Sequence, residues 1–172
     1  MTAGTPPTET EWERQLSARL PLFGHRNWIV VADSAYPAHS KPGIETIVSD
    51  ADHLHVARTV LDAIRASGHA RAIVYTDTEL AFVDEQDAPG VTEYRQALDT
   101  ALYGQKVNHN LHDQIVHTVD QTAQAFNVLV IKTEMTIPYT SVFFELDCAY
   151  WNSEAEERLR QAMVVFDSRW NR

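Results

Sequence analysis

The chain has little cysteine and little glycine, and neither residue stands where common catalytic or phosphate-binding motifs need it. Its one cysteine, Cys148, rules out an internal disulfide framework and a cluster of thiolate metal ligands. Because Cys148 lies in an apolar stretch, it is better explained as a small buried residue than as a nucleophile. None of the six glycines forms a Gly-x-Gly-x-x-Gly or Walker pattern, and no serine has a Gly-x-Ser-x-Gly context. The sequence therefore argues against a Rossmann cofactor and a nucleotide phosphate loop.

Basic side chains are also scarce, with 14 lysines and arginines against 24 acidic residues and a formal net charge of −10. That balance opposes binding to nucleic acid phosphates or to anionic lipid. No apolar run is long enough for a transmembrane helix, and residues 1–9 have neither the basic start nor the apolar run of a secretory signal. We therefore expect a cytoplasmic protein with no nucleic acid partner and no membrane partner, which binds a neutral small molecule or other proteins.

The apolar pattern predicts a flexible tail over residues 1–8 and one domain over residues 9–172, in which strands alternate with helices. We expect strands over residues 28–32, 44–48, 70–75 with an extension over 80–83, 128–131 and 141–146. We expect helices over residues 10–20, 49–68, 92–103, within 107–126, and over about 153–168. This alternation is typical of an α/β domain with a mostly parallel sheet flanked by helices.

The strand predicted at residues 28–32 has a titratable residue on either side of it. His25 precedes this apolar block and Asp33 follows it. Ligands of open α/β sheets bind where loops cross the strand ends, so both residues are candidates for a site. The histidine could titrate near neutral pH, and the aspartate could bind a hydroxyl or orient an imidazole. The alternative is a turn histidine and a carboxylate that caps the next loop.

A second polar feature precedes the last predicted strand. Tyr139 follows Pro138, and Ser141 stands two residues later on the same side of the chain. A tyrosine there could stack on a sugar ring and form a hydrogen bond through its hydroxyl. The alternative is a core tyrosine that packs under the preceding helix.

The chain contains eight histidines, and their spacing does not favour a metal site. If residues 107–126 form one helix, then His109, His112 and His117 spread over a wide arc of it, and no His-Glu-x-x-His motif is present. His53 and His55 would point to nearly opposite sides of their helix. We therefore expect neither a metal nor another cofactor.

Together these features resemble the D-ribose pyranase / L-fucose mutarotase family, over about residues 20 to 147. That family has a Gly-His pair before a hydrophobic strand that ends in aspartate, and Gly24, His25 and Asp33 match it with the same separation. Residues 132–141 look like the counterpart of its Thr-Gly-Glu-x-x-x-Tyr-x-Asn segment. In the ribose pyranase branch a further histidine precedes the tyrosine by twenty-two residues, and His117 stands at that separation from Tyr139.

The chain departs from the family pattern at two positions: Glu134 replaces the glycine of the Thr-Gly-Glu segment, and Ser141 replaces the asparagine. A serine is shorter and cannot both donate and accept as an amide does, so contacts with the substrate must differ there. If His117 lies in the middle of a helix, then His109 or His112 could take its place. The helices expected at the two ends of the chain are additions to the compact family pattern.

The resemblance implies a D-ribose pyranase-like fold and a cofactor-free sugar isomerase or mutarotase that forms a ring-shaped homo-oligomer with sites between subunits. It assigns His25 as the proton donor, and Asp33, His117, Tyr139 and Ser141 as residues that bind the monosaccharide. Opening and closing a hemiacetal ring needs an acid and a base but no redox group. The alternative is a non-catalytic monosaccharide-binding or scaffold protein on the same fold.

Overall fold

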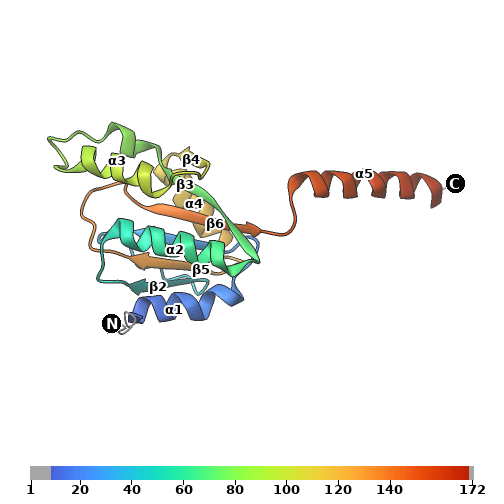
Figure 1. Cartoon of the computed structure of the whole chain (residues 1–172), viewed down its shortest axis with the longest axis horizontal. Helices are drawn as coiled ribbons and strands as arrows, with labels where there is room; N and C mark the ends of the chain where they lie inside the picture. Colours follow the sequence, from blue (N-terminus) through green and yellow to red (C-terminus); the bar gives the residue numbers. More distant parts are fainter. Residues whose placement is uncertain (1–8, 171–172) are drawn as a thin grey trace, which may run out of the picture.

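The computed structural model describes residues 9–170, so the expected tail over residues 1–8 lies outside the described residues. A six-stranded sheet with the order β2-β5-β1-β6-β3-β4 forms the centre of the molecule (Figure 1). All neighbouring strands in it are parallel except β6, which runs antiparallel to both β1 and β3. The strands are β1 (Trp28–Ala32), β2 (Ile44–Val48), β3 (Ala70–Asp77), β4 (Val107–Asn110), β5 (Val128–Lys132) and β6 (Val142–Cys148). The expected α/β domain with a mostly parallel sheet is confirmed.

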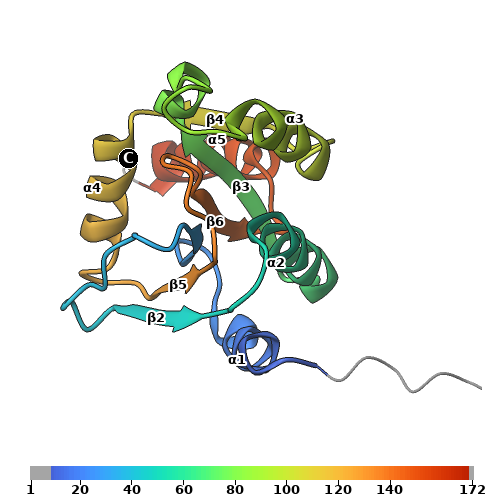
Figure 2. The same ribbon diagram turned by 90° about the vertical axis from the view of Figure 1, so that its left-hand side faces the viewer.

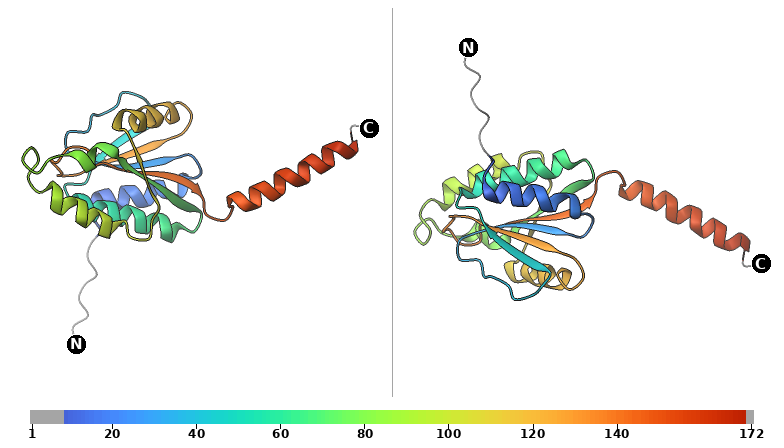
Figure 3. Two further views of the ribbon diagram at one scale, coloured as in Figure 1. Left: turned by 90° about the horizontal axis from the view of Figure 1, so that it is seen from above. Right: turned by 90° about the horizontal axis from the view of Figure 1, so that it is seen from below.

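The sheet separates two hydrophobic cores because successive residues of a strand point to opposite faces. In β1, Ile29 and Val31 pack into the larger core, whereas Trp28 and Val30 pack into the smaller one. The larger core lies under the helices α1 (Glu11–Arg19), α2 (His53–Ser67) and α3 (Val91–Ala101), and the smaller core lies under α4 (His112–Thr122) (Figures 2 and 3). Every residue of β1 is buried, which explains why this strand was readable as a continuous apolar block.

Helices α1 and α2 have standard capping signals. The N–H of Thr10 donates to Glu13 at the start of α1, and the N–H of His55 donates to Asp52 at the start of α2. Gly68 ends α2 with φ of 70°, a left-handed conformation that glycine adopts without steric cost. The helices are α1 (Glu11–Arg19), α2 (His53–Ser67), α3 (Val91–Ala101), α4 (His112–Thr122) and α5 (Ser153–Trp170), with short 3₁₀ segments at Leu20–Leu22 and Thr78–Phe82.

One sequence expectation was wrong, and one strand was not expected. Residues 80–83 do not extend β3, because the chain turns into the 3₁₀ segment Thr78–Phe82 directly after Asp77. The helix expected within residues 107–126 is present as α4, but Val107–Asn110 before it pairs in parallel with the end of β3 as strand β4. Pairing with a neighbouring strand outweighs the weak local preference of this polar sequence. The change places His112 at the first residue of α4.

Helix α5 extends away from the body of the molecule (Figure 1). Several apolar side chains on it are exposed, among them Leu159 and Met163. Within residues 9–170, no helix has both the length and the apolar character that crossing a membrane requires.

Candidate active site

A small cavity lies where the carboxyl ends of β1 and β3 meet the start of β6. The first residue of β6, Val142, pairs with both Val31 of β1 and Thr76 of β3. Because β6 is antiparallel to both neighbours, its start lies beside their ends, and the loops that follow β1 and precede β6 converge there. The cavity has a volume of about 180 Å³ and is lined by Asp33, Ala35, Tyr36, Pro37, Asp77, His112, Pro138, Tyr139 and Ser141.

His112 is held in this cavity through both its backbone and its ring. Its backbone N–H donates to the two carboxylate oxygens of Glu79 at 3.0 and 3.1 Å, which fixes the start of α4. Its ring Nδ1 donates to Asp77 Oδ2 at 3.0 Å. The ring of Tyr139 packs edge-on against the imidazole, with 5.5 Å between ring centroids. An imidazole whose Nδ1 is held by a carboxylate has its Nε2 free to accept or donate a proton.

Two carboxyl groups near His112 titrate above their ordinary range. The side chain of Asp77 has no exposed surface, and this burial raises its pKa to about 6, although the hydrogen bond and charge of His112 act in the opposite direction. Glu79 and Asp33 raise the pKa of Asp77 further through like-charge repulsion. Burial also raises the pKa of Asp33, against the backbone hydrogen bond from Tyr36. Perturbed carboxyl groups beside an imidazole are typical of a site that moves protons near neutral pH.

Buried polar atoms without a protein partner gather at this cavity. Among the residues that the structure describes, the buried side-chain nitrogen and oxygen atoms without a hydrogen-bond partner are Tyr36 Oη, His39 Nε2 and Asp77 Oδ1. Tyr36 and Asp77 line the cavity, and the ring of His39 packs against Tyr36 with 5.8 Å between centroids. Buried polar groups are nearly always hydrogen-bonded, so these atoms mark a place where a ligand can complete the bonding.

The loop before β6 is strained at one residue and firmly held at the next. Tyr139 has φ of 59°, a left-handed conformation that is unfavourable for a residue with a side chain and that often occurs at functional sites. The carbonyl of Thr140 accepts hydrogen bonds from His53 Nε2 at 2.8 Å and from Tyr94 Oη at 2.9 Å. Burial lowers the pKa of His53 to about 4, so its imidazole is neutral near pH 7. These two buried donors fix the backbone that carries Tyr139 and Ser141.

Three of the residues predicted from sequence lie together in the cavity: Asp33, Tyr139 and Ser141. His25 does not, because it precedes β1 whereas Asp33 follows it, and the five residues of that strand alone rise about 16 Å. His25 is instead exposed, and its Nδ1 donates to Asp147 Oδ1 at 3.0 Å near the far end of β6. Within one chain, His25 and Asp33 do not share a site.

His117 does not line this cavity within one chain, and its predicted role stays a prediction. It is exposed in the middle of α4, about one and a half turns after the residue that starts the helix. His112, one of the two alternatives to His117, lines the cavity. His109, the third histidine considered, lies on β4, and Thr76 Oγ1 lies 2.9 Å from its Nδ1.

Sequence reasoning missed Asp77, Glu79 and Tyr36. Asp77 and Glu79 fall between the strand expected over residues 70–75 and its expected extension over 80–83, although a carboxylate at a strand end is the same signal that identified Asp33. Nothing in the sequence indicated that Tyr36 turns its hydroxyl into the protein interior.

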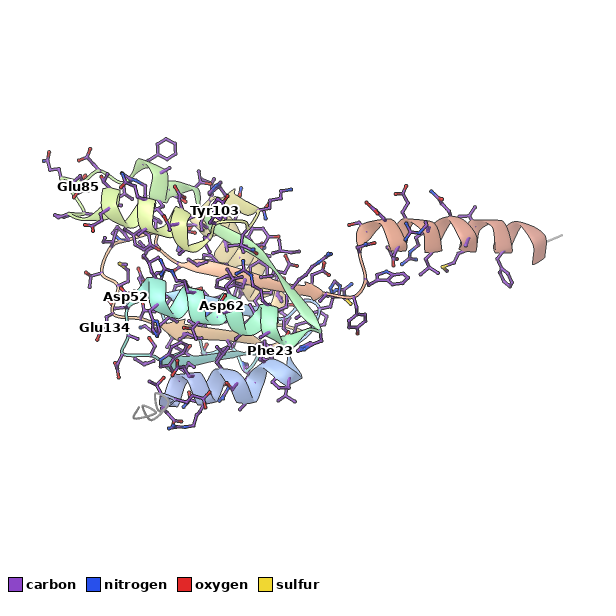
Figure 4. The ribbon with its side chains drawn as sticks, in the orientation of Figure 1. Phe23, Asp52, Asp62, Glu85, Tyr103 and Glu134 are labelled. Carbon is purple, nitrogen blue, oxygen red and sulfur yellow. The ribbon has the colours of Figure 1, made fainter. Side chains whose placement is uncertain are left out.

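Glu134, which departs from the family pattern, lies away from the cavity. It is exposed on the loop after β5 (Figure 4), and its backbone N–H donates to the carbonyl of Ala51. Its φ is not positive, so this backbone position does not need a glycine.

A larger cavity of about 530 Å³ lies beside α4, between Arg26, Trp28 and Glu145. Within the described part of the chain, it has no buried polar side-chain atom that lacks a partner. A third cavity of about 460 Å³ shares Asp77 and is also lined by His109 and Asp99. Of these three cavities the smallest alone is lined by Tyr36, whose buried hydroxyl has no partner, and it is therefore the better candidate for chemistry.

Comparison with known families gives a match to the RbsD / FucU transport protein family over residues 11–148. The match begins at the first residue of α1 and ends at the last residue of β6, so α5 lies beyond it. Among curated protein sequences, none matches this chain.

Solved structures with the same fold cover most of the chain. Bacillus subtilis RbsD in complex with D-ribose is 15% identical, with a TM-score of 0.56, and covers 86% of this chain and 97% of its own. The fucose mutarotase from Streptococcus pneumoniae in complex with L-fucose is 16% identical, with a TM-score of 0.52, and covers 85% and 98%. FucU from Bifidobacterium longum is 14% identical, with a TM-score of 0.54, and covers 84% and 98%. At these identities the likeness concerns the fold.

Proposed function

Because the chain belongs to the RbsD / FucU transport protein family, we propose that it binds a monosaccharide in the cavity at His112 and interconverts the ring forms or anomers of that sugar. The observation that carries this proposal is the grouping of one imidazole, two carboxyl groups and two phenols around a cavity of about 180 Å³. That volume equals about six water molecules, which suits a small polyol. The family includes mutarotase and pyranase enzymes, and relatives with this fold have D-ribose or L-fucose bound.

The proposed reaction opens and closes a hemiacetal ring without a cofactor. His112 Nε2 accepts the proton of the anomeric hydroxyl, while Asp33 in its protonated form donates to the ring oxygen. The bond between the anomeric carbon and the ring oxygen breaks as the carbonyl forms. On closure a sugar hydroxyl adds to that carbonyl, its proton returns to Asp33, and His112 returns its proton to the anomeric oxygen. Positioned acid and base groups of this kind accelerate reactions by about 10²–10⁴-fold.

The supporting residues fit these roles. The carboxylate of Asp77 holds Nδ1 of His112 at 3.0 Å and so directs Nε2 toward the ligand. The raised pKa of Asp33 increases the share of this carboxyl group that carries a proton near neutral pH. Tyr139 and Ser141 line the cavity and supply hydroxyl groups for binding.

The role of His25 as proton donor stays a prediction, and it requires another copy of the chain to bring this residue to the cavity. His25 can reach such a cavity only if it comes from a second copy of the chain. The ring-shaped homo-oligomer expected from the family resemblance would supply that copy, and the exposed imidazole of His25 leaves it accessible to a neighbour.

The proposal is tested by exchange NMR on D-ribose, L-fucose and a panel of other aldoses. We expect the protein to accelerate exchange between ring forms or anomers of at least one sugar. Heat-denatured protein at the same concentration controls for general catalysis by its eight histidines. Equal exchange rates with native and denatured protein across the whole panel would contradict the proposal.

A non-catalytic monosaccharide-binding protein is the second candidate, favoured by Ser141, which stands in the cavity where the family pattern has an asparagine. It predicts saturable sugar binding without any acceleration of ring exchange. Sugar titration and exchange rates measured on the same samples therefore separate the two candidates.

A further inference from the structure

Two polar atoms at the buried side of the cavity have no role in the ring-opening steps. Tyr36 is 4% exposed and its Oη has no partner, and Asp77 is 2% exposed and its Oδ1 has no partner. In contrast, Tyr139 is 39% exposed. Tyr36 and Asp77 therefore form the inner wall of the cavity, and Tyr139 lies toward its mouth.

The chemistry of these two atoms restricts what can satisfy both of them. Asp77 Oδ1 in its ionised form only accepts hydrogen bonds, whereas the phenol of Tyr36 can donate one. An alcohol hydroxyl both donates and accepts, so the hydroxyl groups of a polyol can serve each atom. An ammonium group could donate to Asp77 but could not accept from Tyr36. A phosphate or carboxylate could accept from Tyr36 but would be repelled by the Asp77 carboxylate.

Both atoms are already buried without a partner in the free protein, so a ligand hydroxyl that reaches them forms a hydrogen bond that a deoxy analogue cannot form. A site built to bind a hydroxyl group therefore rejects the analogue that lacks it more strongly than an apolar pocket rejects a missing methylene.

We propose that Tyr36 Oη and Asp77 Oδ1 form a hydroxyl-binding subsite at the inner wall of the cavity, which selects uncharged sugars that carry a hydroxyl at one particular ring position. This inference rests on the proposed function, and it adds the substrate class that the cavity accepts. This subsite should not bind sugar phosphates, uronic acids or the sugar that lacks the hydroxyl at that position.

The test combines deletion of ligand hydroxyls with deletion of protein groups. NMR titration measures the binding of D-ribose, L-fucose and their monodeoxy analogues to the wild-type protein, to Tyr36→Phe and to Asp77→Asn. We expect one deoxy position to weaken binding about tenfold to hundredfold in the wild type. In Tyr36→Phe we expect the affinity for the parent sugar to fall by about tenfold or more. In the same variant, the deoxy analogue that binds weakly to the wild type should bind less than about threefold more weakly than the parent sugar.

Tyr75→Phe is the matched control, because it removes a hydroxyl that lines the other cavity and donates to Glu145 Oε2 at 2.8 Å. It should keep the full preference for the hydroxylated sugar. The melting temperature of the free protein gives a second readout. Tyr36→Phe removes a hydroxyl without a partner and should keep or raise the melting temperature, whereas Tyr75→Phe breaks a formed hydrogen bond and should lower it.

The outcomes distinguish this subsite from the proposed function. If a parent sugar binds and its ring exchange is accelerated, but every deoxy analogue binds equally well, then the subsite is refuted and the proposed function stands. Unchanged sugar affinity in Tyr36→Phe would also refute the subsite. If no parent sugar binds the wild-type protein, then both the subsite and the proposed function are refuted.

Discussion

Replacing Asp77 with asparagine is expected to stabilise the fold at alkaline pH. The side chain of Asp77 is fully buried, one of its oxygens has no partner, and its burial raises its pKa to about 6 from an ordinary 3.8. Asparagine has nearly the same shape without the charge, and its carbonyl oxygen can still accept from His112 Nδ1.

The magnitude follows from the two pKa values. A folded-state pKa above the unfolded value means that the folded protein holds this proton more tightly, so the contribution to stability is present below pH 3.8 and is lost as the pH rises through 6. At 1.36 kcal/mol per pH unit, the ionised carboxylate costs about 3 kcal/mol above pH 6. That figure already includes the attraction of His112. The amide N–H₂ of asparagine, which replaces the unpartnered Oδ1, offsets part of the gain, so we expect Asp77→Asn to raise the free energy of unfolding by about 1–2 kcal/mol at pH 8.

Urea denaturation at pH 4.5, 5.5, 6.5 and 8 measures this difference. The urea midpoints of the two proteins are converted to free energies of unfolding with one m value for both. The gain should be small at pH 4.5, grow up to about pH 6 and stay constant above it. His53, whose lowered pKa acts in the opposite direction, is present in both proteins and cancels in the difference. Asp62→Asn, on the exposed face of α2 (Figure 4), controls for the loss of one negative charge and should change stability by less than about 0.5 kcal/mol. A loss of stability at pH 8, or a gain of equal size at every pH, would refute the reasoning.

Three further predictions test other parts of the molecule. Tyr139 has φ of 59°, which glycine adopts without strain, so the melting temperature of Tyr139→Gly should equal or exceed that of the wild type. Its sugar affinity in NMR titrations should fall by about tenfold or more; an unchanged affinity would show that the tyrosine ring does not contact the sugar. Because the folded-state pKa of His53 is lowered to about 4, its contribution to stability is present above pH 6.5 and is lost as the pH falls through 4. The urea midpoint of His53→Gln should therefore fall less steeply than that of the wild type between these pH values, and parallel curves would contradict this. Thr10→Ala, which removes the hydroxyl that donates to Glu13 at the start of α1, should cost about 1 kcal/mol in urea unfolding and leave ring exchange unchanged; altered exchange would link α1 to the site.

Local apolar patterns made most of the sheet predictable. Strand β1 was predicted with its observed bounds because all five of its residues are buried, and a continuous apolar block between turn residues has few other interpretations. Strand β4 was missed because Val107–Asn110 is short and polar and exists through its pairing with β3. The antiparallel direction of β6, which places its start beside the ends of β1 and β3, was also not derivable from local sequence.

The site was predictable where a polar residue directly adjoined a recognisable strand. Asp33 and Tyr139 were identified in this way, and both line the cavity. His25 was grouped with Asp33 although one residue enters β1 and the other leaves it, and the rise of a strand separates two such residues. His117 was chosen by its separation from Tyr139 along the chain, whereas access to the cavity depends on where α4 begins. That start is set by Glu79, which accepts the backbone N–H of His112.

The most direct test of the account compares sugar ring-exchange rates, measured by exchange NMR, for the wild type, His112→Ala and His117→Ala. These variants remove one imidazole each from the same helix, the first from the cavity and the second from the exposed middle of α4. We predict that His112→Ala loses about 10²-fold or more of the acceleration and that His117→Ala keeps it. Full acceleration by His112→Ala, in a protein whose unfolding shows that it is folded, would contradict the claim that this cavity opens the sugar ring.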